Sequence, residues 1–208
     1  MDNTRRSFLA TTTALAAGVT AGCLGSDGDG DDDDTVPEPP VAGDPDADVT
    51  VTVYDDFACP HCRTFKLEIY PQLVETYIEP GRIRFEQRDF PIPVDDTWSW
   101  AVASAAREAY ESEGDEAFWS FSSAIFERQM SYSYDTIEGV AEEQGLDAAA
   151  VREAAEDVTH RSTLEADKSY GRENGVRGTP AIFVDGEQVE LQALSFERVS
   201  APIDAALE

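Results

Sequence analysis

Residues 56–65 read "DFACPHCRTF" and place two of the three cysteines of the chain, Cys59 and Cys62, one helical turn apart. The preceding run "DVTVTVYD", residues 48–55, alternates apolar and polar side chains, a pattern that predicts a strand. Pro60 fits the first turn of a helix, because the N–H that proline lacks would have no partner there. We therefore expect Cys59 at a helix N-terminus, where free N–H groups and the helix dipole stabilise a thiolate and lower its pKa.

A cysteine pair at this spacing has several possible uses. A c-type haem requires CxxCH, but Arg63 follows the second cysteine. A structural zinc site takes four protein ligands, and His61 between the two cysteines has the wrong spacing, so we predict no metal. A structural disulfide across two residues closes almost no loop and stabilises little. Redox chemistry remains the best interpretation, with the Cys59–Cys62 disulfide itself as the redox group and no other cofactor.

The rest of the chain predicts one α/β domain at residues 49–208. After the strand at 48–55 we expect a helix from 60 to about 77 and a second strand in "GRIRFEQRDFP", residues 81–91. A helical block of about 75 residues follows. The chain then reads as a β-hairpin, with strands at 181–184 and 188–191 around the turn Asp185-Gly186, and closes with a helix at 196–207.

Two motifs together resemble a known family. "DFACPHC" is followed, about 115 residues later, by "GVRGTPAIFVDG". This combination is similar to the DsbA-type thiol–disulfide oxidoreductases of the thioredoxin superfamily, and the resemblance covers residues 49–208. It implies a thioredoxin-like fold with a helical insertion at about 95–172, and a cis peptide bond at Thr179-Pro180 facing the cysteines. Six aromatic side chains are expected to help bury the insertion: Trp98, Trp100, Phe118, Trp119, Phe121 and Phe126.

The roles implied by this resemblance agree with the chemistry of the residues. Cys59 would be the exposed nucleophile that forms the mixed disulfide, and Cys62 the shielded resolving thiol. A cationic or donating His61 would further stabilise the Cys59 thiolate. The backbone of Thr179, before Pro180, would pair with an extended substrate chain by strand addition.

The sequence departs from the family at one position. Many members have a buried Glu six residues before the first cysteine, thought to relay protons to the resolving thiol, and this chain has Val53 there. Asp55 lies on the same face of the strand by parity, and Asp56 is closer along the chain. We expect Asp55 or a water molecule to take over the relay, with Asp56 as the other candidate.

The charge of the chain narrows its partners and its setting. Asp and Glu number 43 against 15 Lys and Arg, a net charge of −28, and the acids are spread over the whole sequence. This distribution is typical of a protein adapted to high salt, which screens the self-repulsion. It argues against nucleic acid, whose phosphates require Lys and Arg.

The N-terminal region predicts export and anchoring. Residues 1–22 read as a signal peptide of the twin-arginine type, with Arg5-Arg6 before a mildly apolar run. "TAGC", residues 20–23, resembles a lipoprotein cleavage box and makes Cys23 the expected lipidation site. Residues 23–48 are rich in Gly, Pro and acids, so we expect a disordered, extended linker between anchor and domain.

These observations lead to one functional hypothesis with open alternatives. We expect an extracytoplasmic protein thiol–disulfide oxidoreductase, held by a lipid at the outer face of the membrane, that is a net disulfide donor to exported proteins. The alternatives are a disulfide reductase or isomerase, and a non-catalytic binding module that keeps the fold. The sequence does not specify the redox partner, which can be soluble or membrane-bound, nor the substrates or the oligomeric state.

Overall fold

The computed structural model of the chain describes residues 36–92 and 94–208. The expectations for the signal peptide at 1–22, for lipidation at Cys23 and for the linker up to residue 35 lie outside these residues. Among the described residues, no helix is both long and apolar enough to span a bilayer.

A mixed sheet of five strands, in the order β1-β3-β2-β4-β5, forms the frame of the fold. The central strands β2 (Thr50–Asp55) and β3 (Arg84–Asp89) are parallel, as a connection through a helix allows. β4 (Ala181–Val184) pairs antiparallel with β2, and the short β5 (Glu187–Gln188) pairs with β4. β1 (Val41–Gly43) runs antiparallel to β3 at the other edge.

The helix after β2 is continuous from Pro60 to Ile78 but is wound in two ways. The α-helical parts α1 (Pro60–Thr64) and α2 (Tyr70–Leu73) alternate with wider π-helical turns at Phe65–Ile69 and Val74–Ile78. Pro71 lies in the second α-helical part and has no N–H to donate to the preceding turn, which accounts for the disturbed winding there. The predicted helix is confirmed.

This helix and α8 (Phe196–Ala206) bury one face of the sheet. The strand residues on that face alternate along the chain, as the period of two requires. The cluster contains Val51, Val53, Phe85, Ile182 and Val184 from the strands, and Phe65, Ile69, Leu73, Val199 and Ile203 from the helices.

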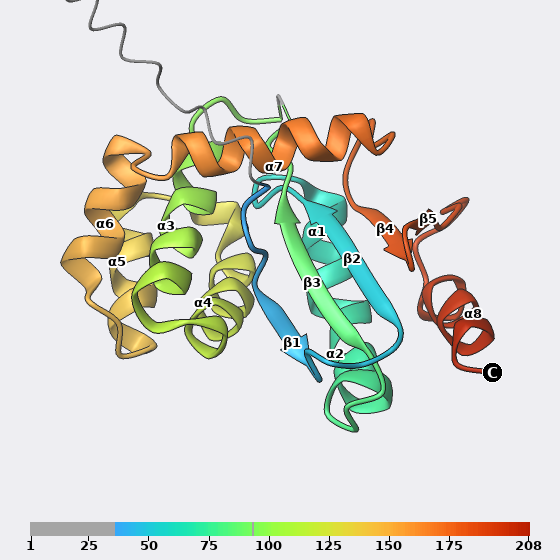
Figure 1. Cartoon of the computed structure of the whole chain (residues 1–208). Helices are drawn as coiled ribbons and strands as arrows, with labels where there is room; N and C mark the ends of the chain where they lie inside the picture. Colours follow the sequence, from blue (N-terminus) through green and yellow to red (C-terminus); the bar gives the residue numbers. More distant parts are fainter. Residues whose placement is uncertain (1–35, 93) are drawn as a thin grey trace, which may run out of the picture. The chain divides into compact units, whose positions relative to one another are not determined.

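Five α-helices are inserted between β3 and β4, which confirms the thioredoxin-like fold with a helical insertion. They are α3 (Trp98–Glu113), α4 (Asp115–Glu127), α5 (Tyr134–Glu143), α6 (Ala148–Asp157) and α7 (Arg161–Glu173). In Figure 1, α7 crosses the sheet on the side opposite α1 and α2. The inserted helices have a core of their own, to which the loop of the cysteine pair also belongs.

The six aromatic side chains expected to bury the insertion divide into two groups. Phe118, Phe121 and Phe126 are fully buried. The tryptophans at 98, 100 and 119 are half-buried and pack at the border of the cores. All six therefore help to bury the insertion, the phenylalanines inside its core and the tryptophans by covering it.

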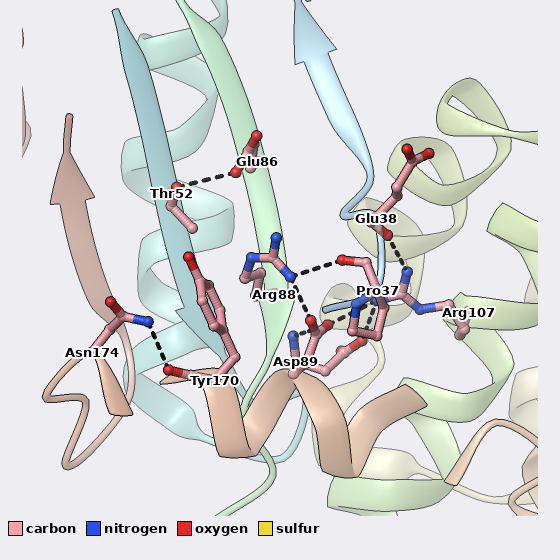
Figure 2. A network of polar contacts seen from close by, with 10 residues as sticks. Pro37, Glu38, Thr52, Glu86, Arg88, Asp89, Arg107, Tyr170 and Asn174 are labelled. Atoms are coloured by element: carbon pink, nitrogen blue, oxygen red, sulfur yellow. Dashed lines mark hydrogen bonds and ion pairs between the residues drawn. The ribbon is translucent and has the colours of Figure 1, made fainter. Parts of the chain in front are cut away.

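The prediction of a disordered linker at residues 23–48 is wrong for the last part of that range. The segment from residue 37 to 43 lies along β3, where Arg88 and Arg107 each donate a hydrogen bond of 3.0 Å, to the carbonyls of Pro37 and Glu38 (Figure 2). The N–H of Val41 donates to Asp115 of α4 at 2.6 Å. These contacts satisfy the backbone polar groups of the segment, so its low apolar content does not prevent ordering.

The two arginines that hold this segment belong to a buried ionic network. Arg107 of α3 lies 3.2 Å from Asp89 and 3.0 Å from Asp167, and Arg88 lies 2.6 Å from Asp167. Because Asp89 is on β3 and Asp167 on α7, the network ties the insertion to the sheet. Burial raises the pKa of Asp89 to about 7, although the charge of Arg107 acts in the opposite direction.

Candidate active site

Cys59 lies where the sequence predicts it, at the N-cap of α1 with Pro60 as the first helical residue. The loop after β2 turns through a backbone hydrogen bond of 2.9 Å from the Cys59 N–H to the Asp56 carbonyl. The first turn of α1 thus directs the free backbone N–H groups of His61 and Cys62 toward the Cys59 sulfur, where both lower the pKa of the thiol.

The second predicted motif faces the cysteines as expected. The peptide bond between Thr179 and Pro180 is cis. The Cys59 Sγ lies 3.5 Å from the Thr179 carbonyl oxygen and donates a hydrogen bond to it as a thiol. Residues separated by 120 positions in sequence therefore meet at the reactive sulfur.

Cys59 is more buried than expected. The residue is only 3% exposed, rather than an open nucleophile, because its side chain lies against the Thr179 carbonyl. Its pKa is nevertheless lowered from 9.0 to about 5. The largest cause is the hydrogen bond from the Cys62 thiol; the Thr179 side chain and the backbone N–H groups of the helix N-terminus add to it, against the effect of burial. Cys59 is thus a thiolate at neutral pH.

Cys62 has the opposite properties. The residue is 0% exposed, and its Sγ accepts a hydrogen bond of 3.4 Å from the Asp56 backbone N–H. Burial raises the pKa of Cys62 well above its usual range, and the neighbouring Cys59 and Asp55 add to the effect. The two free thiols therefore differ sharply in acidity. Cys59 is the more acidic of the two, and the Cys62 thiol donates a hydrogen bond to it.

The His61 side chain is exposed. The contribution that the structure shows from this residue is its backbone N–H, which lowers the pKa of Cys59. Among the hydrogen bonds of the described residues there is none from the His61 ring to Cys59, so its predicted action on the thiolate stays a prediction.

Asp55 is buried beneath the cysteine pair, at the end of β2, while Val53 is part of the apolar core. One carboxyl oxygen of Asp55 accepts a hydrogen bond of 3.0 Å from Gln87 of β3. Burial raises the pKa of Asp55 well above its usual range, with Asp89 acting in the same direction and Lys66 against it. Ionisation of Asp55 is therefore disfavoured, and its carboxyl group is close enough to Cys62 to raise the pKa of that thiol.

Lys66 is a member of this buried cluster that the sequence did not reveal. Its ammonium nitrogen lies 4.1 Å from the Tyr70 ring centre and 4.4 Å from the Trp119 ring centre. Burial lowers the pKa of Lys66 to about 7, although the charge of Asp55 acts against this. The local signal was a lysine on an apolar helix face, four residues before Tyr70. The second aromatic neighbour, Trp119, belongs to a distant segment and could not be inferred from it.

Asp56 fixes the shape of the loop. Its two carboxylate oxygens accept hydrogen bonds of 2.7 Å from the backbone N–H groups of Ala58 and Ile92. Burial raises the pKa of Asp56 to about 6, against the lowering effect of these N–H groups. Its carboxylate thus joins the cysteine loop to the segment after β3.

The insertion also holds the cysteine loop, through residues that the sequence did not identify. The Gln129 side chain donates to the carbonyls of Phe57 at 2.8 Å and Cys59 at 3.0 Å. The Tyr132 hydroxyl donates to the Phe57 carbonyl at 3.0 Å, and the Phe57 ring stacks on Phe126. Both polar residues lie near the end of α4, where the local sequence contains no signal of such long-range contacts.

Within residues 36–92 and 94–208, no cluster of three or more His, Cys, Asp or Glu could hold a metal ion. The site consists of a dithiol pair at a helix N-terminus, an opposing cis-proline loop and a buried acid. This arrangement defines a dithiol protein of thioredoxin-like fold.

Comparison with known proteins agrees with this class. Residues 35–205 match a family model described as Thioredoxin. A probable disulfide bond formation protein D of Bacillus anthracis is 28% identical over 176 residues, which cover 80% of this chain and 77% of the relative. The disulfide bond formation protein D of Bacillus subtilis is 23% identical over 175 residues, covering 81% and 77%.

Solved structures share the fold. Oxidised BdbD from Bacillus subtilis has a TM-score of 0.74 at 23% identity, covering 81% of this chain and 92% of that one. DsbA from Chlamydia trachomatis has a TM-score of 0.70 at 18% identity, covering 82% and 92%. The chain belongs to the thioredoxin family and is a protein thiol–disulfide oxidoreductase, and it shares its fold with BdbD and DsbA.

Proposed function

We propose that the chain is a net disulfide donor to exported proteins and that Cys59 and Cys62 carry the reaction. A client thiolate attacks Cys59 in the Cys59–Cys62 disulfide, which breaks the S–S bond and forms a client–Cys59 disulfide. A second client thiolate then attacks the client sulfur and releases Cys59 as a thiolate. The client gains a disulfide, and the protein takes up two electrons and becomes the dithiol.

The observation that supports this direction is the lowered pKa of Cys59, about 5. At pH 7 a thiol with this pKa is almost entirely ionised, which favours the reduced form by about 100-fold over a thiol of ordinary pKa. A tenfold change corresponds to about 30 mV for a two-electron couple, so the thiolate makes the disulfide more oxidising by about 60 mV.

Asp55 is the proposed proton relay for Cys62. When the disulfide opens, Cys62 leaves as a thiolate in a buried place where its pKa is high, so it needs a proton. Asp55 has a raised pKa and can donate this proton. The ammonium group of the neighbouring Lys66 compensates the negative charge of the resulting carboxylate. Asp56 is excluded from this role in the proposal, because its carboxylate oxygens bind backbone N–H groups.

The proposed setting rests on the sequence. The twin-arginine pattern at Arg5-Arg6 and the box ending in Cys23 support export and a lipid anchor at the outer face of the membrane. The net charge of −28 supports a medium of high salt. There the enzyme would meet exported clients with thiols and a separate redox partner that reoxidises it.

Trapping tests the catalytic roles. Cys62→Ser removes the resolving thiol, so mixed disulfides between Cys59 and client proteins should accumulate and be visible on non-reducing gels. Cys59→Ser is the matched control and should trap none. Equal trapping by the two variants would overturn the role assignment, and trapping by neither would favour a binding module.

Fractionation tests the anchor. Wild-type protein should partition with membranes, and Cys23→Ser should release it or leave the signal peptide uncleaved. A soluble wild-type protein whose N-terminus is not residue 23 would rule out lipidation.

A further inference from the structure

A groove of about 430 Å³ lies between the segment after β3 and the end of α7. Three apolar and three cationic side chains line it: Phe90, Ile92, Val176, Lys168, Arg172 and Arg177. The apolar residues come from the segment after β3 and from the loop after α7. The cations come from the last two turns of α7 and from the residue after Val176.

Two segments connect this groove directly to the cysteines. Ile92 donates its N–H to the carboxylate of Asp56, whose own N–H donates to the Cys62 sulfur. Arg177 precedes Thr179 by two residues, and the Thr179 carbonyl contacts the Cys59 sulfur. A chain that is bonded to Cys59 can therefore reach the groove within a few residues.

The charge of this groove is unusual for the molecule. The sequence has 43 acids and only 15 basic residues, yet the groove is lined by three cations and no carboxylate. Arg172 and Arg177 are exposed, and across the described part of the chain neither lies within 4 Å of a carboxylate oxygen. Other arginines, such as Arg128, Arg152 and Arg161, form ion pairs on the surface.

The third cation of the groove, Lys168, makes different contacts. Its ammonium group donates to the carbonyl of Pro91 and lies 5.2 Å from the centre of the Trp100 ring. Partial burial and the charge of Arg172 lower the pKa of Lys168, while Asp56 and Glu165 act in the opposite direction. Lys168 thus fixes the segment after β3 and adds positive charge to the inner wall of the groove.

A second, larger hollow has the opposite charge. It has a volume of about 890 Å³, lies between the β4–β5 hairpin and α8, and does not include the cysteines. Its charged lining consists of Asp185, Glu187, Glu190, Glu197 and Arg198. An acidic peptide would be repelled there and attracted by the groove at Arg172 and Arg177.

We propose that the groove binds an acidic segment of the client next to the cysteine being oxidised. This inference rests on the proposed function and adds to it the charge class of the substrate. The arginines at 172 and 177 attract the client carboxylates, and the apolar floor takes an apolar side chain between them. Such selectivity suits clients that share the acidic composition of this chain.

The test uses two short peptides that differ only in flanking charge. Each has one pair of cysteines and the same apolar residues, with aspartates in one peptide and lysines in the other. The oxidised full chain is mixed with each peptide, and the second-order rate constant of thiol oxidation is measured at low and high salt. We expect the wild type to oxidise the acidic peptide about tenfold faster at low salt, with a smaller ratio at high salt.

Charge reversal locates the effect. Arg172→Glu should lower the acidic-to-basic ratio by about three- to tenfold. Arg198→Glu, which reverses another exposed arginine in the acidic hollow, is the matched control and should leave the ratio unchanged. Because the Arg177 guanidinium also donates to the carbonyls of Arg172 and Val176, Arg177→Lys is used there, and its retained charge should preserve the ratio.

The outcomes separate this inference from the proposed function. Oxidation of both peptides at equal rates, or equal effects of Arg172→Glu and Arg198→Glu, would overturn the groove and leave the oxidoreductase intact. Failure of the wild type to oxidise either peptide would overturn the proposed function as well. If Arg172→Glu instead weakens binding to vesicles of anionic lipid while the peptide ratio stays the same, the groove is a lipid site and the proposal is wrong.

Discussion

At the scale of single residues, the chemistry depends on the difference between two sulfurs in one helical turn. Cys59 receives backbone N–H groups and the Cys62 thiol, whereas Cys62 is enclosed and receives a single N–H from Asp56. The lowered pKa of Cys59 and the raised pKa of Cys62 follow from this difference. In the proposed mechanism, this difference makes Cys59 the nucleophile, Cys62 the resolving thiol and the disulfide the acceptor of electrons from the client.

The Cys59 thiolate makes the stability of the reduced form depend on pH. A pKa lowered from 9.0 to about 5 contributes stability that is fully present above pH 9 and is lost as the pH falls through about 5. At pH 7 this contribution is about 3 kcal/mol. Thermal unfolding of the reduced and oxidised forms should be measured from pH 5 to 8. The stability of the reduced form should increase relative to that of the oxidised form as the pH rises. A difference between the two forms that does not vary with pH would contradict the assignment. Cys59→Ser, which has only the dithiol-like form, should lack the gain in stability that the reduced wild type shows as the pH rises.

Removing the Asp55 acid should change how oxidation depends on pH. In Asp55→Asn, Cys62 has no buried acid to protonate it, so client oxidation should slow by about tenfold or more and the pH–rate profile should change shape. Glu153→Gln, on the exposed side of α6, is the control for loss of one carboxylate. If the profile of Asp55→Asn equals that of the wild type, Asp55 has no part in the mechanism.

At the scale of elements, the sequence predicted those whose signal is local. The alternation in β2, Pro60 at the start of α1 and the Asp-Gly turn after β4 all appear where expected. The strand β1 was missed because its three residues lie in a stretch rich in Pro and Asp, and the partners that order it are far away in sequence. Gln129, Tyr132 and Lys66 were missed for the same reason, since each acts through contacts with distant segments.

The close approach of α7 to the sheet gives a test at this scale. A Cβ on Gly171 would lie 2.8 Å from the Phe90 ring and 2.9 Å from the Tyr54 ring. Gly171→Ala should therefore destabilise the fold by about 1–3 kcal/mol, measured by denaturant unfolding. Gly139→Ala in α5, where a Cβ would contact nothing within 4 Å, should be neutral or stabilising by up to about 1 kcal/mol. Equal effects of the two changes would contradict the packing.

At the scale of the whole domain, residues 36–208, the buried ionic network joins the sheet, the insertion and the N-terminal segment. Arg107 is 0% exposed, pairs with two carboxylates and also holds the Glu38 carbonyl. The insertion in turn holds the cysteine loop through Gln129 and Tyr132. The position of the redox site therefore depends on how firmly the insertion is attached.

Replacing Arg107 should lower the stability of the whole domain. Arg107→Met leaves Asp89 and Asp167 buried with one fewer cation, so the free energy of unfolding should fall by about 3–5 kcal/mol. Arg128→Met removes an exposed pair with Glu143 and should cost no more than about 1 kcal/mol. Similar losses for both variants in denaturant unfolding would show that the network does not hold the domain together.

The reduction potential of the Cys59–Cys62 pair, measured at equilibrium with glutathione at high salt, tests the central claim most directly. The thiolate at Cys59 and the buried thiol at Cys62 predict a disulfide donor, with a potential above about −200 mV. Cys59→Ser, which cannot form the disulfide, provides the baseline. A wild-type value near about −270 mV, as reducing as that of thioredoxin, would contradict the account.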